Sequence, residues 1–213
     1  MRIEGGEARG RLLQTPNGQN TRPTDGRTRE VLFAIIGARV VGARVLDLYA
    51  GSGAIGLEAL SRGADFVVFI EQEFAAIRSI KANLKILGWE KRALVWNGNA
   101  RSAVGKLLEN GEKFDLIIAD PPFTLPEEPQ ILGARVDAAV GLLNNESVGT
   151  PEEESETVAE TPESGPGLFV VQHSHRVPAA KMTHFQLVRQ KKAGESMLSF
   201  YLPDPDSQIK ITK

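Results

Sequence analysis

Cysteine is absent from the 213 residues of this chain. Its absence excludes disulfide bonds, thiolate metal sites and every reaction that needs a cysteine nucleophile. Histidine is also scarce, since only His173, His175 and His184 occur. His173 and His175 have no third ligand at a spacing typical of a metal site. The sequence therefore predicts no bound metal, and any chemistry must use other side chains.

The chain also lacks a long hydrophobic run. No apolar stretch comes near the roughly 20 residues that cross a bilayer. The opening Met-Arg-Ile-Glu-Gly-Gly-Glu carries charges where a signal peptide needs an apolar core. Hydrophobic residues make up 41% and charged residues 24% of the chain, as in ordinary soluble domains. We therefore expect a cytoplasmic protein without a membrane anchor. A monomer is expected as well, although neither composition nor hydropathy bears on the oligomeric state.

Basic residues are missing from one long segment. Between Arg135 and Arg176 there is no lysine or arginine, and this segment holds eight of the 27 acidic residues. The rest of the chain then has 25 basic against 19 acidic residues, a balance that suits a polyanionic partner such as nucleic acid. Residues 144–167 are rich in Glu, Pro, Ser, Thr and Gly and cannot bury enough apolar surface to stay ordered. We expect a flexible acidic insert at 144–167.

Three glycines follow the first strongly apolar run of the chain. Gly51, Gly53 and Gly56 have the spacing G-x-G-x-x-G, in which a strand passes through a tight turn into a helix and the backbone can approach a nucleotide-like ligand. Glycine turns of this shape also occur as plain connections, so nearby carboxylates matter for the interpretation. Asp47 lies within the apolar run, and Glu71 ends the next one.

The two carboxylates distinguish between cofactors. Glu71, at the tip of the second strand, is placed to accept hydrogen bonds from both hydroxyls of a ribose, which dinucleotides and S-adenosylmethionine share. Asp47 would repel a pyrophosphate over the loop, whereas it favours the sulfonium and ammonium cations of S-adenosylmethionine. The pattern therefore indicates a methyltransferase. Methylation at carbon 5 of a pyrimidine is excluded, because it ordinarily requires a cysteine to attack the ring.

Strands and helices are expected to alternate along the chain. This order predicts an α/β, Rossmann-like class I methyltransferase fold with a mostly parallel central sheet, helices on both faces and an antiparallel C-terminal strand pair. Ligands bind at the carboxyl ends of such strands, here over Asp47, Glu71, residues 97–100 and Asp120. Helices are expected from about residue 27 and over 55–61, 73–87, 103–110 and 131–143, and the later strands over 66–70, 94–96, 114–119, 168–172, 185–189 and 197–202.

A second motif follows the strand that ends at residue 119. Asp120, Pro121, Pro122 and Phe123 lie where the cofactor is expected. Consecutive prolines lack N–H donors and keep the backbone extended, so that the carbonyls of Asp120 and Pro121 can face a substrate. An exocyclic amine has two N–H donors, and these acceptors would orient its nitrogen toward a methyl donor. Phe123 would stack on an unstacked base, which indicates an amino methyltransferase acting on a nucleic acid.

The first 28 residues are expected to form an arginine-rich, extended or hairpin-like arm, followed by one main domain at 29–213. Arginine pairs well with phosphate, and Gly and Pro interrupt any regular pattern here. A solvated terminal tail is the alternative interpretation. The candidate phosphate-binding residues are Arg9, Arg11, Arg22, Arg27 and the adjoining Arg29.

These motifs together resemble the RsmD family of class I methyltransferases. The resemblance rests on residues 2–6, 10–11, 22–33, 46–53, 56–63, 120–123 and 199–201 and covers nearly the whole chain. It implies an enzyme that uses S-adenosylmethionine to methylate the exocyclic N2 of one guanine, position 966 of 16S ribosomal RNA, within the bacterial small subunit. The residues implied to hold the cofactor are Thr24, Asp47, Tyr49, Ala50, Gly51, Ser52, Gly53, Glu71, Asn99 and Ala100.

Three other functions remain open at this point. A DNA adenine-N6 methyltransferase could use the same Asp-Pro-Pro-aromatic motif, although 213 residues show no separate target-recognition domain. A nicotinamide-dependent oxidoreductase could use the same glycine loop, but it leaves residues 120–123 without a role. A noncatalytic RNA-binding protein would bind RNA without affinity for the cofactor.

Overall fold

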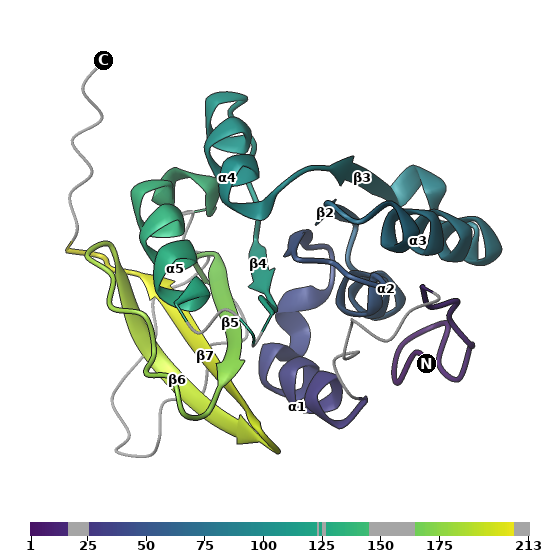
Figure 1. The fold of residues 1–213 in the computed structure, drawn as a ribbon, viewed down its shortest axis with the longest axis horizontal. Helices are drawn as coiled ribbons and strands as arrows, with labels where there is room; N and C mark the ends of the chain where they lie inside the picture. The colour runs from purple at the N-terminus through teal and green to yellow at the C-terminus, as the bar shows by residue number, and fades with distance from the viewer. Residues whose placement is uncertain (17–25, 123, 125–126, 145–164, 207–213) are drawn as a thin grey trace.

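The computed structural model describes residues 1–16, 26–122, 124, 127–144 and 165–206. A seven-stranded sheet runs through the molecule in the order β3-β2-β1-β4-β5-β7-β6 (Figure 1). The five strands β1 to β5 pair in parallel, whereas β7 pairs antiparallel with both β5 and β6. The expected mixed α/β architecture is therefore confirmed.

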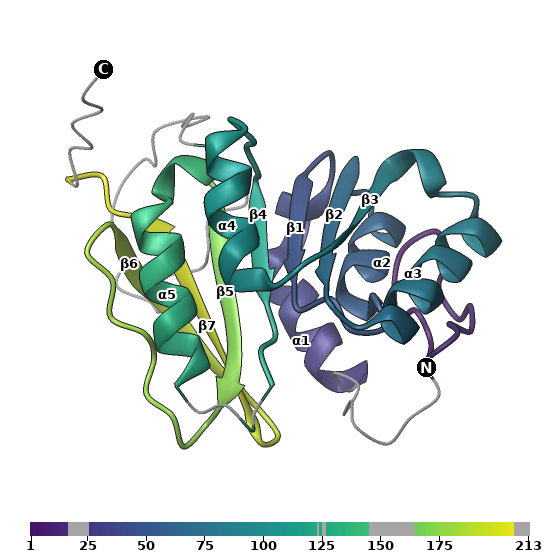
Figure 2. The same ribbon diagram turned by 45° about the horizontal axis from the view of Figure 1, so that its top comes forward.

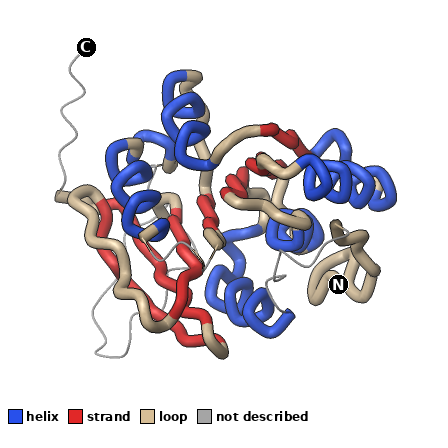
Figure 3. The backbone as a smooth tube through the Cα atoms, viewed as in Figure 1, coloured by secondary structure: helices blue, strands red, loops and turns tan. Residues whose placement is uncertain are grey.

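The first half of the chain builds one end of the sheet, with helices alternating between strands (Figures 1 and 3). Its elements are α1 (Gly26–Ile36), the short 3-10 turn η1 (Gly37–Val40), β1 (Arg44–Leu48), α2 (Ala54–Ser61), β2 (Phe66–Glu71), α3 (Phe74–Leu87), the 3-10 turn η2 (Glu90–Arg92) and β3 (Ala93–Asn97).

The second half adds the other end of the sheet, where α4 and α5 lie in front of β4, β5 and β7 in Figure 2. Its elements are α4 (Ala100–Glu109), β4 (Leu116–Ala119), α5 (Glu128–Ala138), the 3-10 turn η3 (Val140–Leu142), β5 (Leu168–Ser174), β6 (Phe185–Ala193) and β7 (Ser196–Pro203).

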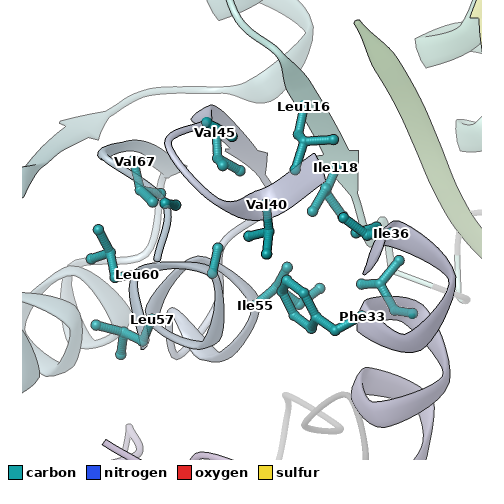
Figure 4. Packing of buried hydrophobic residues seen from close by; sticks show 14 of the residues in the cluster. Phe33, Ile36, Val40, Val45, Ile55, Leu57, Leu60, Val67, Leu116 and Ile118 are labelled. Carbon is teal, nitrogen blue, oxygen red and sulfur yellow. The ribbon is translucent and has the colours of Figure 1, made fainter. Parts of the chain in front are cut away.

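Two hydrophobic clusters cover the two faces of the sheet, because side chains alternate along each strand. Val45 and Val67 face α1, α2 and α3 in the first cluster, and Figure 4 shows them above Leu57 and Leu60 of α2. Leu46 and the residues that alternate with the first set face α4 and α5. The central strands are thus buried on both faces, which explains their continuous apolar runs.

Element boundaries differ from the sequence prediction where a local contact extends or shortens an element. Helix α4 begins at Ala100 rather than 103, because the Asn99 side chain caps it by accepting a hydrogen bond from the Arg101 amide. Strand β4 begins at Leu116, and Phe114 forms only an isolated bridge with Leu143. The C-terminal strands β6 and β7 are longer than expected and meet at a tight turn that contains Gly194 with φ 60°.

The N-terminal segment packs onto the domain. Residues 1–16 form a hairpin closed by an antiparallel bridge between Arg2 and Leu12, and the side chains of Ile3 and Leu13 are buried in the core. The Glu7 amide donates to the Ser61 carbonyl at the end of α2 at 2.8 Å. Both views place this segment beside α2 and α3 (Figures 1 and 2). Most of the expected acidic insert, residues 145–164, lies outside the described residues.

Candidate functional site

Sheet register brings the predicted site residues to one edge. In the parallel pairings Leu48 lies beside both Ile70 and Ala119, and Glu71 lies beside Asn97. The residues that follow these strands therefore meet at their carboxyl ends, where open parallel sheets bind ligands. Tyr49, Asp120 and the segment after Asn97 share this edge.

The glycine loop between β1 and α2 is held in one shape. Gly53 has φ 79° and occupies the position before α2, a left-handed conformation that favours glycine. Gly56 packs so closely on β2 that an added Cβ would lie 2.2 Å from Cε1 of Phe69. The Gly56 amide donates to Oδ2 of Asp47 at 2.9 Å. The strand carboxylate therefore supports the first turn of the helix directly.

Asp47 is 1% exposed, and its second carboxylate oxygen, Oδ1, has no hydrogen-bond partner among the described residues. The pKa of Asp47 is raised to about 8: burial raises it most, the Gly56 hydrogen bond lowers it, and the negative charges of Asp120 and Glu71 raise it. An unpaired buried acceptor among three carboxylates suits a cationic or N–H-donating ligand. This environment fits the ammonium and sulfonium groups of S-adenosylmethionine and disfavours a pyrophosphate.

Glu71 connects the glycine loop to the start of α3. Its Oε2 accepts from the Gly51 amide at 2.6 Å, and its Oε1 accepts from the Gln72 and Glu73 amides at 2.8 Å each. The sequence predicted a ribose contact for this side chain but not these three amides. An ionised carboxylate has about four acceptor positions, so the carboxylate retains capacity for a ribose hydroxyl while it shapes the loop.

The remaining predicted cofactor residues line the same edge. The Ala50 amide pairs with the Ile70 carbonyl at 3.0 Å, and Ser52 Oγ lies 3.9 Å from Met1 Sδ. Asn99 caps α4, and its amide nitrogen donates to Oε1 of Gln72 at 3.3 Å, whereas Ala100 is buried. Thr24 lies outside the described residues.

Tyr49 takes part in a cluster that the sequence did not reveal. Its hydroxyl donates to Oε1 of Glu128, the first residue of α5, and both oxygens of Glu128 accept from the Arg101 guanidinium. The Arg101 hydrogen bond lowers the pKa of Glu128, so the carboxylate is ionised at neutral pH. Tyr49 has φ 64°, an uncommon conformation for a non-glycine residue. No local signal links these three residues, because Glu128 is 79 positions from Tyr49.

The Asp-Pro-Pro motif follows β4 at the same edge. The Asp120 amide lies 3.5 Å from the Leu48 carbonyl at the end of β1, and its side chain is half-buried. Pro121 is buried and Pro122 is exposed. Asp120 is also close enough to Asp47 for their charges to interact. Phe123 lies outside the described residues.

The predicted RNA-binding arginines fall into two groups. Arg9, Arg11 and Arg27 are exposed. Arg29 is 1% exposed and donates through Nη2 to the Arg2 carbonyl at 2.7 Å and to Glu4 Oε1 at 3.2 Å. Arg29 therefore anchors the N-terminal hairpin to α1 and is not accessible to RNA in this structure, which corrects the role expected for it. Arg22 lies outside the described residues.

Among the described residues, no three His, Cys, Asp or Glu side chains are grouped as a metal ion requires. His173 is buried instead against Ser199, with 2.8 Å between Nε2 and Oγ, and burial lowers its pKa. None of the helices in the described part of the chain is both long and apolar enough to span a bilayer.

Comparison with known proteins gives the family. Residues 1–202 match the family model described as "Conserved hypothetical protein 95". The ribosomal RNA small subunit methyltransferase D of Escherichia coli is 35% identical over 196 residues, which are 92% of this chain and 93% of that protein. The Bacillus subtilis protein YlbH is 41% identical over 123 residues, 58% of this chain and 67% of that protein. The solved structure of the Escherichia coli protein yhhF is similar with a TM-score of 0.70 at 32% identity, covering 96% of this chain and 98% of that chain. The chain therefore belongs to the RsmD family.

Proposed function

We propose that this chain is an S-adenosylmethionine-dependent methyltransferase that methylates the exocyclic N2 of a guanine, position 966, in 16S ribosomal RNA. The observation that carries the proposal is the juxtaposition of Asp120, at the carboxyl end of β4, with the unpaired Oδ1 of Asp47 beneath the glycine loop. Membership in the RsmD family supports the substrate.

The cofactor would lie across the carboxyl ends of β1, β2 and β3. Asp47 and the loop residues Tyr49, Ala50, Gly51, Ser52 and Gly53 would hold its amino acid part, Glu71 its ribose, and Asn99 and Ala100 its adenine, with Thr24 nearby. When bound, the cofactor supplies an electrophilic methyl group on a positively charged sulfur. The negative charge of Glu71 favours the positively charged sulfur, and a cation bound beside Asp47 would favour ionisation of its carboxyl.

Asp120 would act on the target amine. Its carboxylate accepts one N–H hydrogen and the Pro121 carbonyl accepts the other, which orients the nitrogen for attack. As positive charge develops on the nitrogen, the Asp120 carboxylate stabilises it. The same carboxylate can accept the proton that the nitrogen loses. Phe123 would stack on the guanine, which must leave its base stack to reach this edge.

The RNA backbone would contact Arg9, Arg11, Arg22 and Arg27. Arginine side chains form bidentate hydrogen bonds with phosphate. Because ribosomal RNA is in the cytoplasm, an enzyme with this substrate would act there. The substrate would be 16S RNA within a small-subunit particle, bound by one copy of the chain.

Methyl transfer from radiolabelled S-adenosylmethionine tests the proposal. The protein is incubated separately with 16S RNA, with small subunits that lack the modification, and with double-stranded DNA, and the products are digested and identified by mass spectrometry. We expect N2-methylguanine in ribosomal RNA. Finding N6-methyladenine in DNA, or affinity for NAD in place of S-adenosylmethionine, would refute the proposal.

A further inference from the structure

Helix α3 presents a row of exposed side chains that the proposed site does not use. Phe74, Arg78, Lys81 and Lys85 are all exposed, and we call them the α3 ridge. Their spacing of four, three and four residues places them on one face of a helix. Phe74 is 68% exposed, which is unusual for a large aromatic side chain. The opposite face of α3 packs into the core.

The charges of the ridge are not neutralised within the described part of the chain. Five arginines elsewhere have acidic partners there: Arg29, Arg44, Arg62, Arg92 and Arg101 each pair with a glutamate. By contrast, Arg78, Lys81 and Lys85 form no ion pair with any described residue. Helix α3 itself contains no acidic residue. The three cations span about 10 Å, since a helix rises about 1.5 Å per residue.

The ridge begins at the proposed site. Phe74 opens α3 only three residues after Glu71, whose carboxylate shapes the start of the helix. The N-terminal hairpin contacts the same helix, because the Gln14 amide donates to Asn83 Oδ1 at 2.8 Å. It also contacts η2, which follows α3, because Arg92 donates to Glu7 at 3.1 Å. The exposed Arg9 and Arg11 therefore belong to an element that packs on α3, through the buried Asn83 on the face away from the ridge.

We propose that the α3 ridge is a second RNA-binding surface, on which Arg78, Lys81 and Lys85 contact phosphates of the substrate RNA and Phe74 stacks on an unpaired base. An exposed aromatic followed by cations suits single-stranded RNA, which stacks its bases on aromatic side chains and follows basic surfaces with its backbone. This inference rests on the proposed RNA substrate and extends it beyond the hairpin. A binding surface for a protein partner would be expected to carry charges of both signs, whereas the charges of the α3 ridge are all positive.

The test is the salt dependence of binding to a 16S RNA transcript that contains the target region. The variant R78Q/K81Q/K85Q removes three charges and keeps good helix formers. The slope of log affinity against log salt should become shallower by about 2, at about 0.7 per lost contact with a single strand. The matched control K181Q/K191Q/K192Q removes three exposed charges from β6 and the segment before it, and it should change the slope less. Equal changes in both variants, or no change in the ridge variant, would overturn the inference.

Phe74 is tested separately. F74A should weaken RNA binding several-fold while calorimetry shows unchanged affinity for S-adenosylmethionine. A loss of cofactor affinity without a loss of RNA affinity would move Phe74 to the adenine site and overturn its proposed stacking on RNA. Methylation by the parent protein at low salt separates the two proposals. If the parent methylates 16S RNA and the ridge variant binds this RNA as tightly as the parent does, only the ridge inference fails. If the parent does not methylate 16S RNA, the proposed function is refuted.

Discussion

The Tyr49 hydroxyl donates a hydrogen bond to Oε1 of Glu128 and so links the loop after β1 to the first turn of α5. The Glu128 side chain is 2% exposed. It also accepts hydrogen bonds from the guanidinium of Arg101, which lies in the first turn of α4. Three elements that surround the carboxyl edge of the sheet thus meet at one carboxylate. The segment that carries Asp120 leads into α5, so its far end is held against the glycine loop.

Replacing the carboxylate of Glu128 should loosen this edge. E128Q keeps the shape but places an amide opposite Arg101, and we expect a loss of about 1–3 kcal/mol in the free energy of unfolding. Y49F removes only one hydroxyl and should cost about 1 kcal/mol. Urea denaturation measures both. The double variant E128Q/R101Q should lose less than the sum of the single variants, and strict additivity would show that the two side chains do not interact.

Asp47 should make stability depend on pH in an unusual direction. Its pKa is raised from 3.8 to about 8 in the folded state, so the folded protein binds the proton more tightly than the unfolded chain. This contribution is complete below pH 4 and is lost as the pH rises to 8, by up to about 1.4 kcal/mol per pH unit. D47N lacks this titration. Compared with the parent, it should gain stability from pH 5 to pH 8 in urea denaturation. A difference that is constant over this range would contradict the raised pKa.

Glu71 should affect both cofactor affinity and the glycine loop. E71A removes the acceptor for the amides of Gly51, Gln72 and Glu73 together with the expected ribose contact. Affinity for S-adenosylmethionine should fall roughly 10- to 150-fold, or about 1.5–3 kcal/mol, as for hydrogen bonds to a charged group. Calorimetry measures the affinity, and thermal melting should show a lower Tm. Parental affinity in E71A would remove Glu71 from the cofactor site.

Asp120 should affect turnover more than binding. D120N keeps an acceptor oxygen but loses the charge that favours a cationic nitrogen. The activation barrier should therefore rise by about 2–4 kcal/mol, and kcat should fall accordingly. Affinity for S-adenosylmethionine and Tm should stay near parental values. Single-turnover methylation of 16S RNA measures the chemical step. Full activity in D120A would exclude this residue from the mechanism.

The arginines of the N-terminal hairpin should separate into two classes. R9A/R11A should leave Tm unchanged and reduce the salt slope of RNA binding by about 0.7–0.9 per lost phosphate contact. R29A should instead destabilise the fold by about 2–4 kcal/mol, because it removes a buried partner of Glu4 and of the Arg2 carbonyl. An unchanged Tm in R29A would contradict the structural role assigned to it. An unchanged salt slope in R9A/R11A would leave the hairpin arginines as solvated side chains.

Much of the fold follows from local patterns in the sequence. Apolar runs of four to six residues alternate with helical periodicity, and this alternation is typical of a parallel sheet covered on both faces. The spacing of Gly51, Gly53 and Gly56 requires a turn between strand and helix, and the structure places α2 directly after it. The two prolines after Asp120 likewise explain locally why β4 ends, because proline lacks the N–H donor that a sheet ladder needs. Because parallel strands share one carboxyl edge, the sequence alone also predicted that Asp47, Glu71 and Asp120 lie at the same edge of the sheet.

Only the tertiary structure determined which partners these side chains have. Arg29 belongs to an arginine-rich segment, yet its contact with Glu4 spans 25 positions and buries it. Glu128 has no motif of its own, and it meets Tyr49 and Arg101 because α4 and α5 pack on the same face of the sheet. Periodicity and spacing describe neighbours along the chain, whereas burial, ion pairing and a raised pKa depend on atoms that folding brings together from distant positions.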